Sequence, residues 1–432
     1  MLLVLIFLIN IFIFFIFYTF EKENINKFSK YLVWGYLFIY PVLNTFIPDY
    51  KTSIVIVSLD RIFFHLSFMF NIVLILKYRY LEISTSSRFI LIYSLYFFII
   101  SIYNHNFIPN TVLNYLYPIM FIILLDNIEF NVNDRIIFNK LVHGLLIVIF
   151  IVICIQMYKP YFYTGVDVYL NNSEDLYSKK IYNIRHQSIF TGNHYTEAGL
   201  NIAVISLIII QIMKDELNIK NITFTIIAIV SVLLTFTRSN YIFIVIGLSF
   251  FIIFNKKLCL LSKLLILILL CLSIYFFIDA SELQRNDFVY DRILASTYLA
   301  RFERLEIFMS NMINEKLVFG YGIDSLADFA LFKFSQYFSE LHNGYLEILY
   351  RTGLIGFILY FMFWYEIHKR GRNLYRKYND IAIISFITSF ILINFIYKYI
   401  KIGFWGFLLI VIYLKIHETT IITDDDIDRK VY

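Results

Sequence analysis

The sequence is poor in charge, cysteine, proline and glycine, and each shortage excludes a class of protein. Only 16% of the 432 residues are Asp, Glu, Lys or Arg, against about 25% in soluble domains. Five prolines and fourteen glycines exclude a low-complexity chain. The three cysteines, Cys154, Cys259 and Cys271, lie in apolar runs without C-x-x-C spacing. They predict small buried side chains and neither a disulfide nor a metal site.

The chain is instead rich in apolar and aromatic residues. Hydrophobic residues make up 60% of it and aromatic residues 20%, and the mean hydropathy is +0.72. A soluble protein of this length could not bury so much apolar surface around one core. The composition therefore predicts an all-α integral membrane protein surrounded by membrane lipids. The net charge of +5 requires no nucleic-acid partner, because membrane proteins retain Lys and Arg in cytoplasmic loops.

Apolar runs long enough to cross a bilayer recur along the chain and predict about 12 to 13 transmembrane helices. The first run lacks a basic region and a small-residue cleavage site, so we expect a retained span and not a signal peptide. The runs lie at 1–20, 31–48, 61–78, 88–105, 109–126, 138–158, 196–213, 219–237, 239–255, 259–278, 344–366, 380–397 and 402–415.

Lys and Arg are distributed unevenly between the loops, which predicts the orientation. They gather in segments that share one side if the spans alternate, at 22–30, 77–88, 256–263 and 369–377. The opposite loop, 104–110, has neither. This bias places the basic segments in the cytoplasm and the two long loops outside it. For the acidic C-terminal end we expect a solvated, mobile tail.

The predicted organisation follows from the spans and their orientation. A multi-pass membrane protein is expected, with its two long loops outside the cytoplasm. Its parts are N-terminal helices (1–158), helices with a first outer loop at 159–195 (159–278), a large outer loop (279–343), C-terminal helices (344–416) and a cytoplasmic tail (417–432).

A polar stretch opens with His342 and continues, without a predicted break, into the span at 357–364. An imidazole with a pKa near neutrality suits a general base, although a structural interfacial histidine is the alternative. Asn343, Glu347 and Arg351 follow it. On a helix, positions 343 and 347 share a face, so Glu347 is expected to orient Asn343 or an acceptor sugar.

Arginines at the same predicted surface form a second group of candidates. Arg238 separates two apolar runs, so a helical hairpin would place it at the outer end of both helices. Snorkelling to the interface is an equal alternative. Arg301 and Arg304 lie in an apparent amphipathic helix, where salt bridges to nearby glutamates are the alternative. A guanidinium offers a fork of donors that fits a phosphate.

Two weaker signals complete the candidates. Gly320 and Gly322 form a lone G-x-G that follows no strand, so a tight reversal at the bilayer surface is expected and a nucleotide site is not. Arg185 lies in a polar cluster at 184–195 whose two histidines, eight residues apart, lack zinc-site spacing.

Several short motifs in the second half of the chain, between 184 and 364, together carry a family resemblance. His342, Asn343, Gly353 and Gly356 meet the pattern H-[N/S/Q]-x9-G-x-x-[G/T/Y]; Arg301 and Leu305 meet R-x-x-x-L; residues 235–239 resemble an "SRS/SRG" helix end, with Thr237 in place of Ser; residues 304–306 with 319–322 resemble "RLE…GxG"; and residues 185–198 resemble "G-x-x-x-N/H…A". The chain thus resembles the O-antigen polymerase/ligase superfamily.

The resemblance implies a metal-independent, cofactor-free glycosyltransferase with a GT-C-like architecture and amphipathic helices in its large loop. It also implies a multi-pass protein of the bacterial inner (cytoplasmic) membrane, with the two long outer loops and the active site in the periplasm. Its substrate would be a glycan linked to undecaprenyl diphosphate. Arg238 and Arg304 or Arg301 would stabilise the leaving diphosphate, and His342 would accept the proton of the attacking hydroxyl. Substrate-binding roles are implied for Arg185, Asn343, Glu347, Arg351, Gly320 and Gly322.

The same chemistry serves two reactions, and the sequence leaves both open. A polymerase joins lipid-linked repeat units, with a chain-length regulator as a possible partner, whereas a ligase transfers finished polymer to lipid A-core. The strong Ile, Phe, Tyr and Asn bias favours a polymerase. A flippase or other transporter is the alternative from another class. The long basic outer loop, the few mid-span charges and the lack of a visible repeat argue against it.

Overall fold

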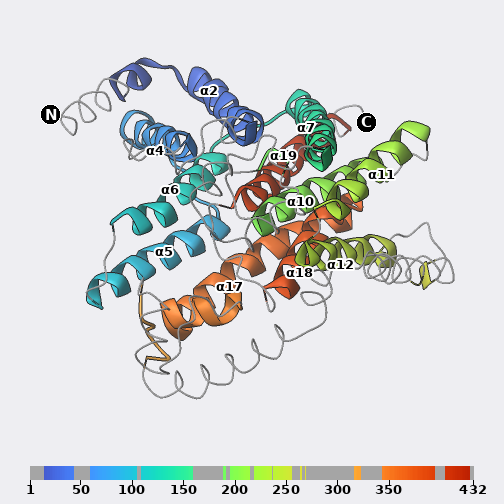
Figure 1. Ribbon diagram of the computed structural model, residues 1–432. Coiled ribbons are helices and arrows are strands. Elements are labelled where there is room, and N and C mark those ends of the chain that lie inside the picture. Colours follow the sequence, from blue (N-terminus) through green and yellow to red (C-terminus); the bar gives the residue numbers. More distant parts are fainter. Residues whose placement is uncertain are drawn as a thin grey trace.

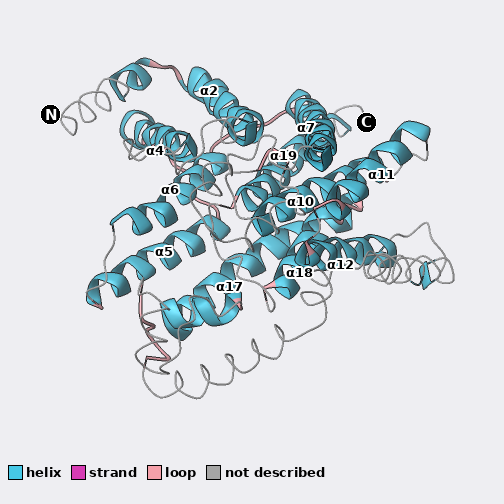
Figure 2. Ribbon diagram, in the orientation of Figure 1, coloured by secondary structure: helices cyan, strands magenta, loops and turns pink. Residues whose placement is uncertain are grey.

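The chain forms a bundle of helices, as the composition predicts (Figure 1). The computed structural model describes residues 14–42, 59–104, 109–158, 188–190, 195–214, 218–235, 237–254, 263–264, 268, 316–322, 343–394 and 404–428. Within these ranges the regular elements are helices (Figure 2). The protein is therefore an all-α integral membrane protein.

The helices follow the apolar runs of the sequence closely. They are α2 (Lys22–Trp34) with its π-helical continuation η1 (Gly35–Ile39), α4 (Leu59–Tyr78), α5 (Thr85–Tyr103), α6 (Pro109–Asp126), α7 (Val132–Tyr158), α10 (Tyr195–Met213), α11 (Ile219–Leu233), α12 (Arg238–Phe254), α17 (Gly344–Tyr378), α18 (Ala382–Ile393) and α19 (Trp405–Asp428). Among the described residues, α4, α5, α7 and α17 are long and apolar enough to cross a membrane. The predicted span at 259–278 lies largely outside the described residues.

Several helices run beyond the predicted spans: α2 begins at Lys22, within the basic segment 22–30, and α7 begins at Val132. The last turn of α17 carries Arg376 and Lys377, and Asn379 follows in the left-handed conformation with φ 55°. Cations in a final turn interact favourably with the helix dipole, and a left-handed residue is a common helix stop. The basic segment 369–377 is therefore helical. Likewise, α19 continues to Asp428, within the expected tail.

Polar contacts between helix ends divide the bundle into two ends. One end, here called the charged end, holds the turns at 79–84, 127–131 and 379–381. Contacts there include Lys30 with Asp134 at 2.7 Å, the Arg370 guanidinium with the Glu418 carboxylate, and the Ser84 amide donating to Asp126 at 2.9 Å. These are the segments that the charge pattern places on one side of the membrane.

The opposite end, here called the site end, is where α5 and α11 finish and where α10, α12, α17 and α19 begin. Among the described residues, its contacts are mostly neutral. The Gly344 amide donates to the Asn394 carbonyl at 2.8 Å, and the Gly406 amide donates to the Asn201 side-chain oxygen at 2.9 Å. The two ends therefore differ in the chemistry that joins their helices.

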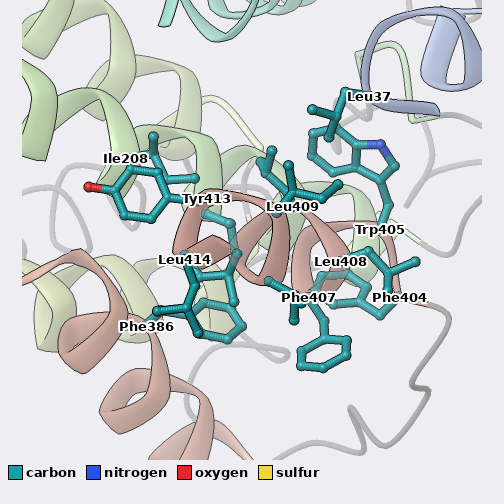
Figure 3. Packing of buried hydrophobic residues seen from close by; sticks show 14 of the residues in the cluster. Leu37, Ile208, Phe386, Phe404, Trp405, Phe407, Leu408, Leu409, Tyr413 and Leu414 are labelled. Carbon is teal, nitrogen blue, oxygen red and sulfur yellow. The ribbon is translucent and has the colours of Figure 1, made fainter. Parts of the chain in front are cut away.

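The core of the bundle is centred on α10 and α19. Buried side chains occur all around both helices, which is typical of a helix enclosed by others (Figure 3). Trp405, at the start of α19, is 2% exposed, and its ring lies 5.1 Å from that of Phe190. Its indole N–H donates to the Tyr36 carbonyl at 3.4 Å. The start of α19 is thus fixed to Phe190 by aromatic packing and to η1 by this hydrogen bond.

A buried carboxyl group joins three elements at the charged end. Asp380 lies in the turn between α17 and α18, where its Oδ1 accepts from the Ala382 amide at 3.0 Å. Its Oδ2 accepts from the Tyr413 hydroxyl and lies 3.4 Å from Nδ1 of His417. Burial raises the pKa of Asp380 above its ordinary value of 3.8, although the Tyr413 hydrogen bond and nearby cations oppose the shift.

Asp380→Asn keeps an acceptor for the Ala382 amide but carries no charge. Because the folded-state pKa of Asp380 is raised, the folded protein retains a proton that the unfolded chain loses, so wild-type stability falls as the pH rises from 3.8 through the folded-state pKa. We expect the Tm of Asp380→Asn in detergent to exceed that of wild type by a margin that grows over this window. Asp380→Ala should melt below both at every pH. A lower Tm for Asp380→Asn than for wild type at neutral pH would show that the carboxylate is ionised and stabilising.

Candidate functional site

The first turn of α17 is organised by Asn343, the residue that follows His342. Asn343 is the N-cap, and its side-chain oxygen accepts from the amides of Tyr345 and Leu346 at 3.1 and 3.2 Å. A cap of this kind satisfies amides that have no partner inside the helix. The Asn343 side chain therefore fixes the start of α17. His342 itself lies outside the described residues.

The same turn is bound to the end of α18. Besides the bond from the Gly344 amide to the Asn394 carbonyl, the Tyr345 hydroxyl donates to the Ile391 carbonyl. A Cβ atom on Gly344 would lie 2.4 Å from the Asn394 side-chain oxygen. Only glycine fits this approach without a shift. The residue two positions after His342 is thus held against a second helix.

Glu347 and Arg351 form an ion pair one turn further along α17. Glu347 Oε1 lies 2.8 Å from Arg351 Nη2, and the Glu347 residue is only 6% exposed. The carboxylate thus contacts Arg351 on the same helix, and its predicted role in orienting Asn343 or an acceptor sugar stays a prediction. Because a pair taken out of water is held more firmly than one on a surface, the guanidinium has a defined position at the site end.

The helix α17 is broken at Gly353, so the prediction of an unbroken stretch from His342 into the span is wrong. Gly353 has φ 60° and ψ −170°, which is not helical. The break leaves the carbonyls of Tyr350 and Arg351 without helical partners. They accept instead from the amides of Tyr321 and Gly322, both at 2.8 Å.

The amides beyond the break are bonded to the same loop segment. The Leu354 and Ile355 amides donate to the carbonyls of Leu317 and Val318 at 2.8 and 3.3 Å. Residues 316–322 thus fill the gap in the hydrogen-bond ladder of α17. We call this arrangement, residues 316–322 bonded to residues 350–355, the backbone interlock.

Glycine is required on both sides of the backbone interlock. Gly320 and Gly322 have φ of 81° and 77°, values that side chains with a Cβ rarely adopt. A Cβ on Gly353 would lie 2.3 Å from the Val318 carbonyl oxygen, and one on Gly320 would lie 2.5 Å from the Gly353 amide nitrogen. The G-x-G segment is therefore docked into a helix and is not a simple reversal at the bilayer surface.

The amides of the two glycines are also engaged inside the protein. The Gly320 amide donates to the Lys316 carbonyl at 2.9 Å and the Gly322 amide to the Arg351 carbonyl. A substrate phosphate would need such amides to be available. The described contacts of Gly320 and Gly322 thus belong to the backbone interlock, and their predicted substrate-binding role stays a prediction.

The predicted hairpin at Arg238 is present, since α11 ends at Leu233 and α12 begins at Arg238. The turn between them is held by buried side chains: the Thr237 hydroxyl donates to the Thr235 carbonyl at 3.0 Å, and Asn240 Nδ2 donates to the Thr235 hydroxyl at 3.4 Å. Asn240 packs so closely on α10 that a Cβ on Gly199 would lie 1.6 Å from its Nδ2. The backbone at Arg238 is thus fixed at the site end, while its side chain lies outside the described residues.

Part of the predicted polar cluster at 184–195 is buried in the bundle. Ser188 has no exposed surface, and its amide donates to the Gln156 side chain at 2.9 Å. Its hydroxyl donates to the Ile149 carbonyl at 2.9 Å. Since Ile149 lies about 13 Å from the end of α7 at 1.5 Å per residue, this segment enters the bundle from the site end.

Three predicted arginines, Arg185, Arg301 and Arg304, lie outside the described residues, as do the amphipathic helix expected around them and most of both long loops. Two residues that the sequence did not single out, Tyr96 and Asn104 of α5 and its C-cap, contact the loop of the backbone interlock. Asn104 begins the short polar loop that lacks Lys and Arg, but nothing in that pattern identifies its partner. In the described part of the chain, no group of three or more His, Cys, Asp or Glu residues could hold a metal ion.

Comparison with known proteins identifies one family in this region. Residues 223–361 match the model of the family described as O-antigen ligase. The match begins within α11, includes Arg238, Arg301, Arg304, the G-x-G and His342, and ends within α17, whereas Arg185 lies outside it. No curated protein matches the chain.

Gly353→Ala should disrupt the backbone interlock. The new methyl group would clash with the Val318 carbonyl, and alanine at φ 60° costs about 1 to 2 kcal/mol. We expect a Tm lower by several degrees and loss of polysaccharide assembly in cells. Gly144→Ala in α7 is the matched control, because its Cβ would meet only Phe38 at 3.9 Å. Replacing a helical glycine there should raise stability by up to about 1 kcal/mol. Equal melting temperatures for the two variants would contradict the interlock.

Proposed function

We propose that this chain, which carries a domain of the O-antigen polymerase/ligase superfamily at residues 223–361, polymerises oligosaccharide repeat units linked to undecaprenyl diphosphate. The family match supports a membrane enzyme of O-antigen or related polysaccharide assembly. The finer assignment rests on what the site end offers to a glycosyl-transfer reaction.

The observation that carries the proposal is the anchoring of the start of α17. Asn343 and Gly344, directly after His342, are fixed by the N-cap and by α18. The backbone of Arg238 is fixed by a buried turn at the same end of the bundle. A base and a cation that act on one bond need such preorganised attachment points, because small misplacements cost large factors in rate.

The reaction requires few catalytic groups. A sugar hydroxyl of the acceptor attacks the anomeric carbon of the donor, a new carbon–oxygen bond forms, and the bond to the diphosphate oxygen breaks. His342 takes the hydroxyl proton, while Arg238 and Arg304, or Arg301 in its place, face the charge that grows on the departing diphosphate. Arginines in these positions supply stabilisation that a metal ion supplies in other glycosyltransferases.

Arg351 is assigned to substrate positioning. Its side chain is 24% exposed while its partner Glu347 is 8% exposed, so the pair presents the guanidinium and buries the carboxylate. The buried Glu347 carboxylate holds the guanidinium in a defined position at the site end. Arg185 is assigned to substrate binding on the resemblance alone.

The charged end is proposed to face the cytoplasm and the site end the periplasm. The support is the positive-inside rule together with the grouping of the basic segments at one end of the bundle. This orientation places the reaction on the outer face of the inner membrane. A chain-length regulator is a possible protein partner there.

Ligation of polymer to lipid A-core is the second candidate, and the family name O-antigen ligase favours it. The two reactions share the donor and the leaving group and differ in the acceptor. We favour polymerisation because the Ile-, Phe-, Tyr- and Asn-rich composition is more typical of polymerases encoded in surface-polysaccharide gene clusters.

Substitutions in the purified protein test the assigned roles. Arg238→Lys and Arg304→Lys keep the charge but lose the forked donor, so each should lower transfer on the order of a hundredfold, equivalent to about 3 kcal/mol. His342→Gln cannot accept a proton at neutral pH and should abolish transfer while donor binding persists. The measurement is product formation from lipid-linked substrate on a gel.

Arg376→Lys is the matched control for the arginine variants, because Arg376 is exposed at the charged end. It should leave the rate unchanged. A near wild-type rate for His342→Gln would make that histidine structural, and the base would then be sought among Glu303, Glu306 and Asp324. Full activity of both Arg→Lys variants would remove the arginines from the site.

A further inference from the structure

The loop segment of the backbone interlock has a second attachment, to α5. The Asn104 side chain contacts it twice: Nδ2 donates to the Gly320 carbonyl at 3.3 Å, and Oδ1 accepts from Lys316 Nζ at 2.5 Å. About two turns earlier in the chain, the Tyr96 hydroxyl donates to the Phe319 carbonyl at 3.0 Å. The segment 316–322 is therefore clamped between α5 and α17, which lie side by side (Figure 1).

The contacts form a continuous path from α5 to Arg351. Lys316 Nζ lies 5.1 Å from the centre of the Tyr321 ring, and that ring stacks on Tyr350 with centroids 4.8 Å apart. The next carbonyl, that of Arg351, accepts from Gly322. A displacement of the loop at Asn104 would thus reach the residue whose guanidinium is presented at the site end.

The broken helix is not itself an anion site. A helix that restarts in a membrane protein can direct its first amides and its positive dipole end at an anionic group. Here the Leu354 and Ile355 amides are already bonded to the Leu317 and Val318 carbonyls. The break therefore provides the position at which residues 316–322 bind to α17. Its functional role depends on the residues that flank this loop segment.

In the sequence, the proposed catalytic residues lie before and after this loop segment. Arg301 and Arg304 precede Lys316, and His342 follows Gly322, all in the segment predicted as the large outer loop. We propose that Asn104 is a positioning residue for glycosyl transfer, which holds this loop in register with α17 through Lys316 and Gly320. The inference rests on the proposed function and adds a residue outside the part of the chain that matches the family.

Asn104→Ala tests the inference in the full-length protein with lipid-linked substrate. Loss of both side-chain bonds should speed hydrogen exchange of the Tyr321 and Gly322 amides at least tenfold. It should lower kcat by about ten- to hundredfold, with a much smaller change in KM. Asn104→Asp keeps the acceptor for Lys316 and loses the Nδ2 donor, which bonds the carbonyls of Gly320 and Ile100, so it should recover part of kcat.

Asn127→Ala is the matched control at the charged end. Asn127 Nδ2 donates to the Glu82 carbonyl at 2.9 Å and its Oδ1 accepts from the Glu82 amide at 2.8 Å, so this asparagine also joins a helix end to a neighbouring segment. Asn127→Ala should lower the Tm as much as Asn104→Ala but leave kcat and the exchange of Tyr321 unchanged.

Two results would overturn the inference while leaving the proposed function intact. One is rapid exchange of Tyr321 and Gly322 in Asn104→Ala with kcat equal to that of Asn127→Ala. The other is unchanged exchange in Asn104→Ala, which would show that Asn104 does not hold the loop. Absence of glycosyl transfer by the wild-type protein would instead refute the proposed function.

Discussion

Lipid offers no hydrogen bonds to a broken helix, and this constraint governs the structure around α17. A break in a membrane-spanning helix leaves carbonyls and amides that cost several kcal/mol each if they stay unsatisfied. At Gly353 the bonds are supplied by the backbone of residues 316–322. The loop can approach because glycines occupy both sides of the contact. The break in α17 and the docking of residues 316–322 therefore depend on each other.

The two ends of the bundle solve the problem of buried polar groups differently. At the charged end, ion pairs such as Lys30 with Asp134 and Arg370 with Glu418 join the helices. At the site end, the contacts among the described residues are mainly caps and backbone hydrogen bonds, and the Glu347–Arg351 ion pair lies within one helix. The proposed binding of an anionic lipid diphosphate at this end would gain from helices that are joined by neutral contacts.

Periodicity and charge predicted the parts of the fold that depend on local sequence. The run at 109–126 is α6 residue for residue, and the basic segments at 77–88 and 369–377 do meet at one end of the bundle. The break in α17 was not predicted, because a single glycine in an apolar run is ordinarily tolerated in a helix. The partner of Gly353, the G-x-G at 320–322, was recognised as a turn, but nothing local shows that a turn will complete the ladder of a helix thirty residues away.

The candidate site likewise combines features that local sequence predicts with features that it does not. The capping role of Asn343 and the hairpin at Arg238 follow from residue type and position, whereas the pairing of Glu347 with Arg351 could not be separated from a pairing with Asn343 by spacing alone. The contacts of Asn104 depend on α5 and α17 being neighbours, which no motif encodes.

The proposed lengthening of lipid-linked glycans is tested most directly by the surface polysaccharide of a strain that lacks this gene. If the chain is a polymerase, a gel of lipopolysaccharide should show lipid A-core with at most a single repeat unit, and the wild-type gene should restore the ladder. Polymer that accumulates on undecaprenyl diphosphate and is absent from lipid A-core would contradict polymerisation and identify a ligase.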